Sequence, residues 1–218
     1  MTVNFTYLVN EVIAACEDDG TEFLAFVPYA VNRAEEKLTK DLDDYGLVTY
    51  TSVAVSSGNS LVTLPSGTRV IKNFNIISNG TKINLLQRTD EFINDYWPVS
   101  SSTGEPKYYA RRNNTTVLIA PTPASTHDGT IVEQSRPTAL SSATQTNYFT
   151  DFCYDTLFLA TMEFATAFQK DFAASDFYKN RYNEEIAKQQ NQARRTRRDD
   201  TQSPASPAGG DNTLKQGA

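Results

Sequence analysis

The sequence predicts an α+β fold: a helical bundle built from the N- and C-terminal segments, an inserted antiparallel β-sheet or barrel, and an extended C-terminal tail. Apolar residues recur at helical spacing before residue 46 and after residue 148, whereas alternating, β-branched runs fill the region between them. Residues 201–218 are poor in apolar groups and hold two prolines and three glycines, which is typical of a tail without its own core. The predicted organisation is helical at 1–46, an inserted β domain at 47–136, helical again at 137–200, and a tail at 201–218 that docks on a partner.

Two helices are predicted in the first segment. One spans residues 6–19, and Gly20 is its expected stop signal. Thr21 is expected to cap the second, which Pro28 should end or kink after its first turn and a half. The apolar faces are Leu8, Val12, Ala15 and Cys16 in the first helix, and Phe23, Phe26, Val27, Ala30, Ala34 and Leu38 in the second.

Strand signals begin after Gly46. The run LVTYTSVAV (47–55) is β-branched and alternating, and LPSG (64–67) has the composition of a turn. Asn79-Gly80 separates the alternating runs RVIKNFNIIS and TKINLLQR, and an Asn-Gly pair in this setting is a strong hairpin signal. The first half of the insertion is therefore predicted to be antiparallel.

The second half of the insertion continues this pattern. A further hairpin is expected where PKYYARR meets TTVLIAP across Asn113-Asn114, followed by the loop TPASTHDG and a last strand in GTIVEQSRP. A short helical piece is predicted in TDEFINDYWP (89–98). Trp97 is expected to plug the sheet rather than bind a ligand.

Two longer helices are predicted to complete the bundle. A Ser175 cap could start the last one, and if it runs to residue 199 it is about 37 Å long at about 1.5 Å per residue. After Ile186 only Ala193 is apolar in this stretch, so its second half is expected to bury nothing within the chain. The preceding helix, at 148–170, is predicted to be central because its apolar residues reach nearly all round it: Phe149, Phe152, Leu157, Phe158, Met162, Phe164, Ala165 and Phe168.

Composition argues against several classes of protein. The N-terminus lacks the basic region and apolar core of a secretory signal, so cytosolic synthesis is expected, and the most apolar stretch is interrupted by acids, so no membrane span is predicted. Cys16 and Cys153 sit among apolar neighbours and are interpreted as small buried hydrophobes. The formal net charge of −6 argues against a duplex-binding domain.

No residue pattern indicates catalysis or a cofactor. His127 is the one histidine, far from any serine or cysteine signature, and is interpreted as an ordinary loop residue. Phosphate-binding glycine motifs and metal-ligand spacings do not occur in the sequence. Asp151 and Asp155 fit the start of a helix, where the backbone dipole favours acids, and Glu35-Glu36 reads as a solvated face. The predicted protein is not an enzyme and has neither cofactor nor metal site.

Two blocks of sequence carry a resemblance to a known family. FVPYAVNRAEEKLTKDLD (26–43) and the block from Tyr148 to Asp200 resemble the head-to-tail adaptor, or connector, proteins of tailed bacteriophages, of the kind found beneath the portal in short-tailed phages. In that family an opening helical pair precedes a β-rich insertion. A long helix rich in aromatics then leads to a Tyr-containing helix that ends in arginines.

The resemblance implies a structural virion protein of the neck, made in the bacterial host cytoplasm. It implies a ring, commonly of twelve copies, that joins the portal protein to the tail nozzle protein, while DNA passes through the channel without sequence-specific binding. Because the DNA must slide, the arginines at the helix end are expected to pair with carboxylates of the portal or of a neighbouring subunit. The predicted partner-binding residues are Arg194, Arg195, Arg197, Arg198 and, in the tail, Leu214.

Other interpretations remain open from sequence alone. The arginines could simply complement the negative end of their own helix. The chain could be another virion part, such as a head-completion or tail-associated protein. A DNA-binding protein or hydrolase would require salt-sensitive affinity for duplex DNA, or turnover that responds to mutation of carboxylates.

Overall fold

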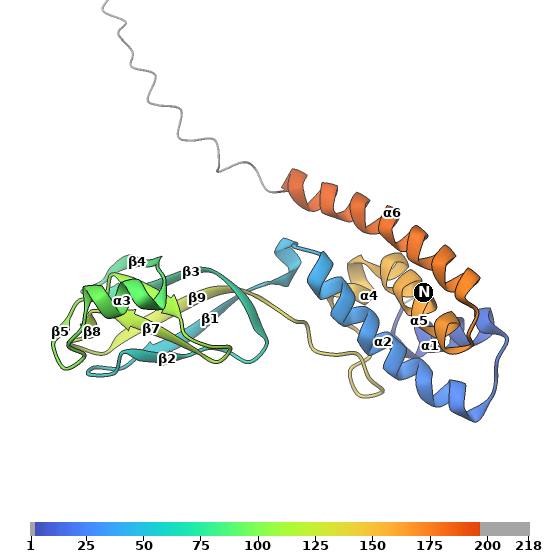
Figure 1. The fold of residues 1–218 in the computed structure, drawn as a ribbon, viewed down its shortest axis with the longest axis horizontal. Helices are drawn as coiled ribbons and strands as arrows, with labels where there is room; N and C mark the ends of the chain where they lie inside the picture. Colours follow the sequence, from blue (N-terminus) through green and yellow to red (C-terminus); the bar gives the residue numbers. More distant parts are fainter. Residues whose placement is uncertain (1–2, 197–218) are drawn as a thin grey trace, which may run out of the picture.

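The structure of the protein, a computed structural model, describes residues 3–196. Within this part all α-helices except the short α3 lie at one end of an elongated molecule, and the strands lie at the other end together with α3 (Figure 1). The helices of the first end come from both ends of the described chain, and the strands lie between them in sequence. The predicted α+β class is confirmed, and the predicted tail lies outside the described residues.

The first two helices are α1 (Phe5–Cys16) and α2 (Thr21–Asp41). Glu17 ends α1 in the left-handed conformation, with φ of 49°, so Gly20 does not stop this helix and instead precedes α2. The expected Thr21 cap is wrong, because Thr21 is already the first helical residue and the N-cap is Gly20, without a side-chain cap. Pro28 does not end α2, which continues through it because the face carrying Val27, Ala30 and Val31 is fully buried.

The strands build a sheet that nearly closes into a barrel. In the described residues its order is β1-β9-β3-β4-β6-β7-β2, and the end strands β1 and β2 contact each other. The pairings between neighbours are antiparallel except for a short parallel pairing of β4 with β6, so the sheet is mixed rather than purely antiparallel. The strands are β1 (Val48–Val55), β2 (Leu61–Thr63), β3 (Thr68–Ser78), β4 (Thr81–Gln87), β6 (Tyr108–Arg111), β7 (Thr116–Ala120) and β9 (His127–Ser135).

Both predicted hairpins are present. Ser78 pairs with Thr81 across a two-residue turn in which Asn79 and Gly80 have φ of 50° and 76°. These positive angles are those of the twisted turn that Asn-Gly favours. In the second hairpin β6 pairs with β7, and Asn113 closes the turn by accepting a 2.8 Å hydrogen bond from the Thr116 amide.

The short helix α3 (Asp90–Tyr96) lies against β6 and β7, as predicted from sequence. Trp97 follows it and packs, half-buried, against a small cluster between α3 and the sheet, while its Nε1 donates to the Ser102 carbonyl at 2.9 Å. The short strands β5 (Thr103–Gly104) and β8 (Thr122–Pro123) pair nearby. The expected loop at 122–129 is thus partly strand, because β9 already begins at His127.

The second helical block consists of α4 (Tyr148–Phe152), α5 (Tyr154–Phe168) and α6 (Phe172–Thr196). The single helix expected at 148–170 is broken at Cys153, whose φ of −132° is not helical. The prediction that α5 is central is confirmed, since it packs against α1, α2, α4 and α6. The expected cap of α6 at Ser175 is wrong: the helix starts earlier, where Asp171 accepts a hydrogen bond from the Ala174 amide at 3.0 Å.

Separate apolar cores fill the two ends of the molecule. The helical core includes Leu8, Val27, Leu38, Phe149 and Leu157, all with no exposed surface. The barrel core includes Val55, Phe74, Ile76 and Ile131, which are equally buried. Polar contacts tie the two ends together at the end of α2: Arg136 to Glu36 at 2.9 Å, Lys72 to Asp43 at 2.8 Å, and Gln134 Nε2 to the Leu42 carbonyl at 2.9 Å.

A buried carboxylate fixes the segment that returns from the sheet to the helices. Glu35 is 1% exposed, so the interpretation of Glu35-Glu36 as a solvated face is wrong for Glu35. Its oxygens accept hydrogen bonds from the Leu140 amide at 3.1 and 3.2 Å and from Asn147 Nδ2 at 2.5 Å. Burial raises the pKa of Glu35 above its ordinary value, although these hydrogen bonds and Arg136 oppose the shift.

The Glu35 carboxyl should make stability depend on pH. Because its pKa is higher in the folded than in the unfolded chain, its contribution to stability is fully present below pH about 4.5 and is lost as the pH rises through the folded value. We expect the Glu35→Gln variant to show a smaller decline in the free energy of unfolding over this window than the wild type. Urea unfolding at a series of pH values measures the difference, and parallel curves for the two proteins contradict it.

Candidate partner-binding surface

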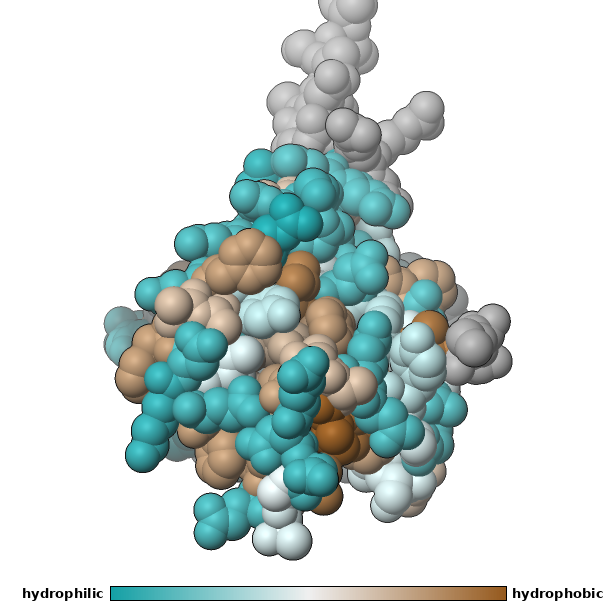
Figure 2. Space-filling view, turned by 90° about the vertical axis from the view of Figure 1, so that its right-hand side faces the viewer, coloured by the Kyte–Doolittle hydropathy of each residue, from teal (hydrophilic) through white to brown (hydrophobic). Residues whose placement is uncertain are grey.

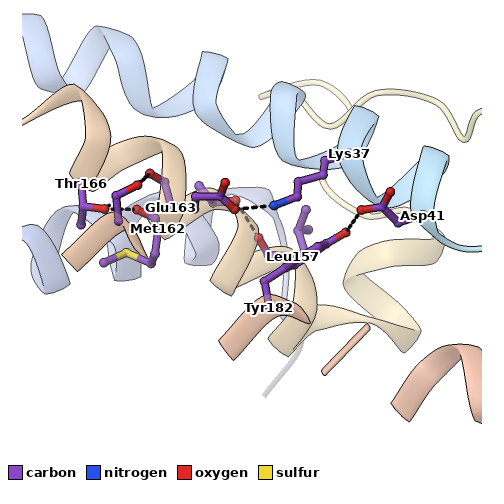
Figure 3. Close-up of polar contacts among 9 residues, drawn as sticks. Lys37, Asp41, Leu157, Met162, Glu163, Thr166 and Tyr182 are labelled. Atoms are coloured by element: carbon purple, nitrogen blue, oxygen red, sulfur yellow. Dashed lines mark hydrogen bonds and ion pairs between the residues drawn. The ribbon is translucent and has the colours of Figure 1, made fainter. Parts of the chain in front are cut away.

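The last helix, α6, is held on the bundle by a polar network that joins it to α2 and α5 (Figure 3). Lys37 on α2 forms an ion pair with Glu163 on α5. The Tyr182 hydroxyl on α6 donates to Asp41 Oδ2 at 2.7 Å, and Lys37 Nζ lies 3.9 Å from the centroid of the Tyr182 ring. Lys37 thus contacts Glu163 on α5 and the Tyr182 ring on α6, so one side chain of α2 stabilises the packing of all three helices.

Further hydrogen bonds extend this network along α6. Ser175 Oγ donates to the Glu163 carbonyl at 3.0 Å near the start of the helix, and Gln190 Nε2 donates to the Asp41 carbonyl at 2.7 Å near its end. Burial, with the neighbouring carboxylate of Asp41, raises the pKa of Tyr182, so its hydroxyl stays protonated and remains a donor. α6 is therefore fixed at both ends.

The second half of α6 buries more than its sequence suggested. Ile186 and Ala193 are 7% and 3% exposed, and Gln190 bonds to the end of α2, so the expectation that this half buries nothing is wrong. One face of the helix turns inward at intervals of three or four residues, which lets isolated apolar and amide side chains make these contacts.

One predicted partner-binding arginine can be placed by its side chain. Arg194 is exposed and lines a hollow of about 270 Å³ together with Asp41, Asp43 and Gln190. Arg195 is described only as helical backbone, and Arg197, Arg198 and Leu214 lie outside the described residues. The role of these residues in partner binding stays a prediction.

Large aromatic side chains stand exposed on the helical end of the molecule. Phe172 and Phe177 on α6 are 67% and 59% exposed, and Phe152 on α4 is 73% exposed. The sequence pattern places Phe152 among the apolar residues of the helix expected at 148–170, so its exposure differs from the prediction. Figure 2 shows hydrophobic side chains exposed between hydrophilic ones on this end of the molecule. Aromatic surface of this kind is enriched in protein interfaces.

A second group of rings links α2 to α5. Phe26 stacks on Phe168 with centroids 4.2 Å apart, and the guanidinium of Arg33 lies 4.3 Å from the centroid of Phe164. Tyr29 extends this group outward and is 58% exposed. The sequence signal for such a surface is an aromatic residue beside, rather than on, the apolar stripe, as at Phe177 next to Tyr178.

The residues considered for chemistry occupy structural positions. His127 is buried in β9, not in a loop, and its Nδ1 lies 3.2 Å from the Ile77 carbonyl oxygen. Burial raises the thiol pKa of Cys16 to about 11 and that of Cys153 to about 12, so neither is a ready nucleophile at neutral pH. Asp151 and Asp155 lie in the first turns of two separate helices, α4 and α5, and not at the start of one helix as predicted, because the chain breaks at Cys153.

Two other kinds of site are absent from residues 3–196. In this range no three His, Cys, Asp or Glu residues gather in a way that could hold a metal ion. None of its helices is long and apolar enough to cross a membrane.

The sequence matches the SU10 adaptor protein family over residues 3–208, and the chain belongs to this family. It is thus a phage structural adaptor protein, in agreement with the resemblance seen in its two helical blocks. A search of curated proteins gives no match.

Proposed function

We propose that this chain assembles into a closed ring that joins the portal protein to the tail of a phage particle and surrounds part of the DNA channel. The observation that carries the proposal is a family match over nearly the whole chain, combined with exposed phenylalanines on a braced helical bundle. A monomer gains nothing by presenting such side chains to water, whereas an assembly removes them from it.

A ring needs a contact between two different faces of each copy. Such a heterologous contact closes when the rotation between copies divides a full turn. Sedimentation velocity over a range of concentrations, followed by electron microscopy of the largest species, tests this directly. Rings, alone or after mixing with the portal protein, support the proposal; a chain that stays monomeric in both conditions contradicts it.

The basic end of α6 and the tail are proposed to bind the portal. Deleting residues 201–218 should leave the free energy of unfolding unchanged, because the helical core described above is formed by residues between Phe5 and Ile186, but should weaken attachment to the portal. Reversing the charges of the four arginines should weaken it similarly. Surface plasmon resonance on immobilised portal measures both effects, and full-strength attachment of the truncated chain would remove the tail from the contact.

A further inference from the structure

A cationic hollow lies at the junction of α2 and the barrel. Its volume is about 770 Å³, and its lining includes Lys40, Arg69, Arg111 and Arg136. Among the described residues that line it, Glu36 is the acidic one. Four cations and one carboxylate leave three positive charges around one open space. We call this space the arginine groove.

The cations of the arginine groove are only partly compensated. Arg136 pairs with Glu36 through Nη1, but its Nε is buried and has no hydrogen-bond partner among the described residues. Arg69 and Lys40 are exposed and form no ion pair within residues 3–196. The exposed guanidinium of Arg69 is suited to bind a carboxylate in the two-point geometry that arginine favours.

Hydrogen bonds and a turn fix the shape of the arginine groove. The Arg111 guanidinium donates to the carbonyls of Thr68, at 3.1 Å, and of Arg69, which orients it along the start of β3. Beside it, Gly67 adopts φ of 86° and ends the turn that forms one wall. Arg111 Nε also donates to the Asn113 carbonyl at 3.3 Å, so each of the three guanidinium nitrogens has a backbone partner and two of the five N–H groups remain. Arg111 therefore contributes a fixed positive charge to the groove.

The chain itself carries a matching acidic segment. The turn between α1 and α2 presents Glu17, Asp18 and Asp19, and Glu22 follows in the first turn of α2. None of these four carboxylates forms an ion pair within residues 3–196. Asp18 stiffens this turn by accepting hydrogen bonds from the Gly20 amide at 2.9 Å and from Gln169 Nε2 at 3.1 Å. The turn lies at the far end of the helical bundle from the barrel, so it does not reach the groove of its own chain (Figure 1).

We propose that the arginine groove binds carboxylates and receives the acidic α1–α2 turn of a second copy of this chain. The proposal rests on the ring described above and names the faces that meet in it. Four carboxylates opposite a groove of three net positive charges give a polar contact that orients one copy on the next. Each copy presents one groove and one turn, so the contact is heterologous and propagates around a ring.

Nucleic acid fits the groove less well. A phosphate backbone would meet a chain whose formal net charge is −6, and ten acids against three bases fall within its first 46 residues. This field repels duplex DNA outside the groove itself. The acidic turn, in contrast, is available in the same number of copies as the groove.

Paired charge reversals test the contact. One variant carries Lys40→Glu and Arg69→Glu, and the other carries Glu17→Lys and Asp19→Lys; none of these four side chains makes an ion pair within the described residues. Each variant alone should self-associate about 10- to 100-fold more weakly than the wild type at low salt. An equimolar mixture should recover assembly, because the unchanged groove of one variant then meets the unchanged acidic turn of the other. The reversed groove meets a turn whose two lysines balance Asp18 and Glu22, so that contact is no longer repulsive.

The control variant carries Lys82→Glu and Lys179→Glu, which change the net charge equally outside the groove and should leave association within about threefold of the wild type. The proposal is overturned if the groove variant assembles normally, or if both variants fail and their mixture stays dissociated. It is equally overturned if the wild type binds a duplex oligonucleotide and the groove variant loses that binding without restoration in the mixture. If the groove variant still forms rings, the groove proposal is wrong but the proposed ring function stands. If the wild type is monomeric, both the groove proposal and the proposed ring function are contradicted.

Discussion

Replacing Tyr182 with alanine should lower the free energy of unfolding by about 3–5 kcal/mol, the usual cost of removing a large buried ring. Tyr182 is 1% exposed and lies where α6 meets α2. The substitution removes its packing, its 2.7 Å hydrogen bond to Asp41 and its contact with Lys37. Lys37 keeps its ion pair with Glu163, so the remaining bundle retains one of its polar links.

Tyr182→Phe separates the ring from the hydroxyl. Asp41 is exposed and water replaces its lost partner, so this variant should lose only about 1 kcal/mol. Urea unfolding followed by far-ultraviolet circular dichroism measures both variants. Equal losses for alanine and phenylalanine would show that the hydrogen bond, and not the packed ring, holds α6 in place.

The phenylalanine variant should also respond differently to alkali. The folded pKa of Tyr182 is raised above the ordinary value of 10.0, so its contribution to stability is present below pH about 10 and is lost as the pH rises further. Tyr182→Phe should therefore lose less stability than the wild type as the pH is raised above about 10. An unchanged alkaline profile would argue that the other buried tyrosines dominate.

Local chemistry allowed much of the fold to be predicted from sequence. The Asn79-Gly80 turn and the apolar face of α2 depend mainly on neighbouring residues, and the structure confirms them. In α1 the predicted face holds at Leu8 and Val12, whereas Ala15 is exposed. The parallel pairing of β4 with β6 and the break at Cys153 depend on tertiary contacts, which periodicity does not contain. The predicted helix cap at Ser175 is wrong for the same reason, because the Ser175 hydroxyl donates to the Glu163 carbonyl of another helix.

The candidate surfaces were harder to predict than the fold. The lining of the arginine groove comes from α2, β3, β6 and the end of β9, and it gathers only when the barrel docks on the end of α2. The sequence indicates instead the arginine cluster at positions 194, 195, 197 and 198. Among these residues the structure describes the side chain of Arg194. A cluster of like charges can be recognised in the sequence, whereas a pocket whose charged residues are far apart in the sequence cannot.

Alanine at both Phe172 and Phe177 should leave the free energy of unfolding within about 0.5 kcal/mol of the wild type, because both side chains are already exposed. The same double variant should weaken self-association by about 30-fold or more, since aromatic side chains buried at an interface commonly contribute 2 kcal/mol or more. Sedimentation velocity measures association, and thermal unfolding checks that the monomer is intact. Lys179→Ala with Asn180→Ala, on the same helix, is the matched control and should assemble normally.

Salt distinguishes this aromatic contribution from that of the acidic turn. The two features lie at one end of the molecule, since Gln169, just before α6, donates to Asp18 in the α1–α2 turn. Burial of a phenyl ring does not depend on ionic strength, whereas exposed charge pairs are screened beyond about 8 Å at physiological salt. The loss caused by Phe172→Ala and Phe177→Ala should therefore persist at high salt, while the loss caused by reversing Glu17 and Asp19 should shrink. If both losses vanish together as salt is raised, the phenylalanines lie outside the contact and charge alone brings the copies together.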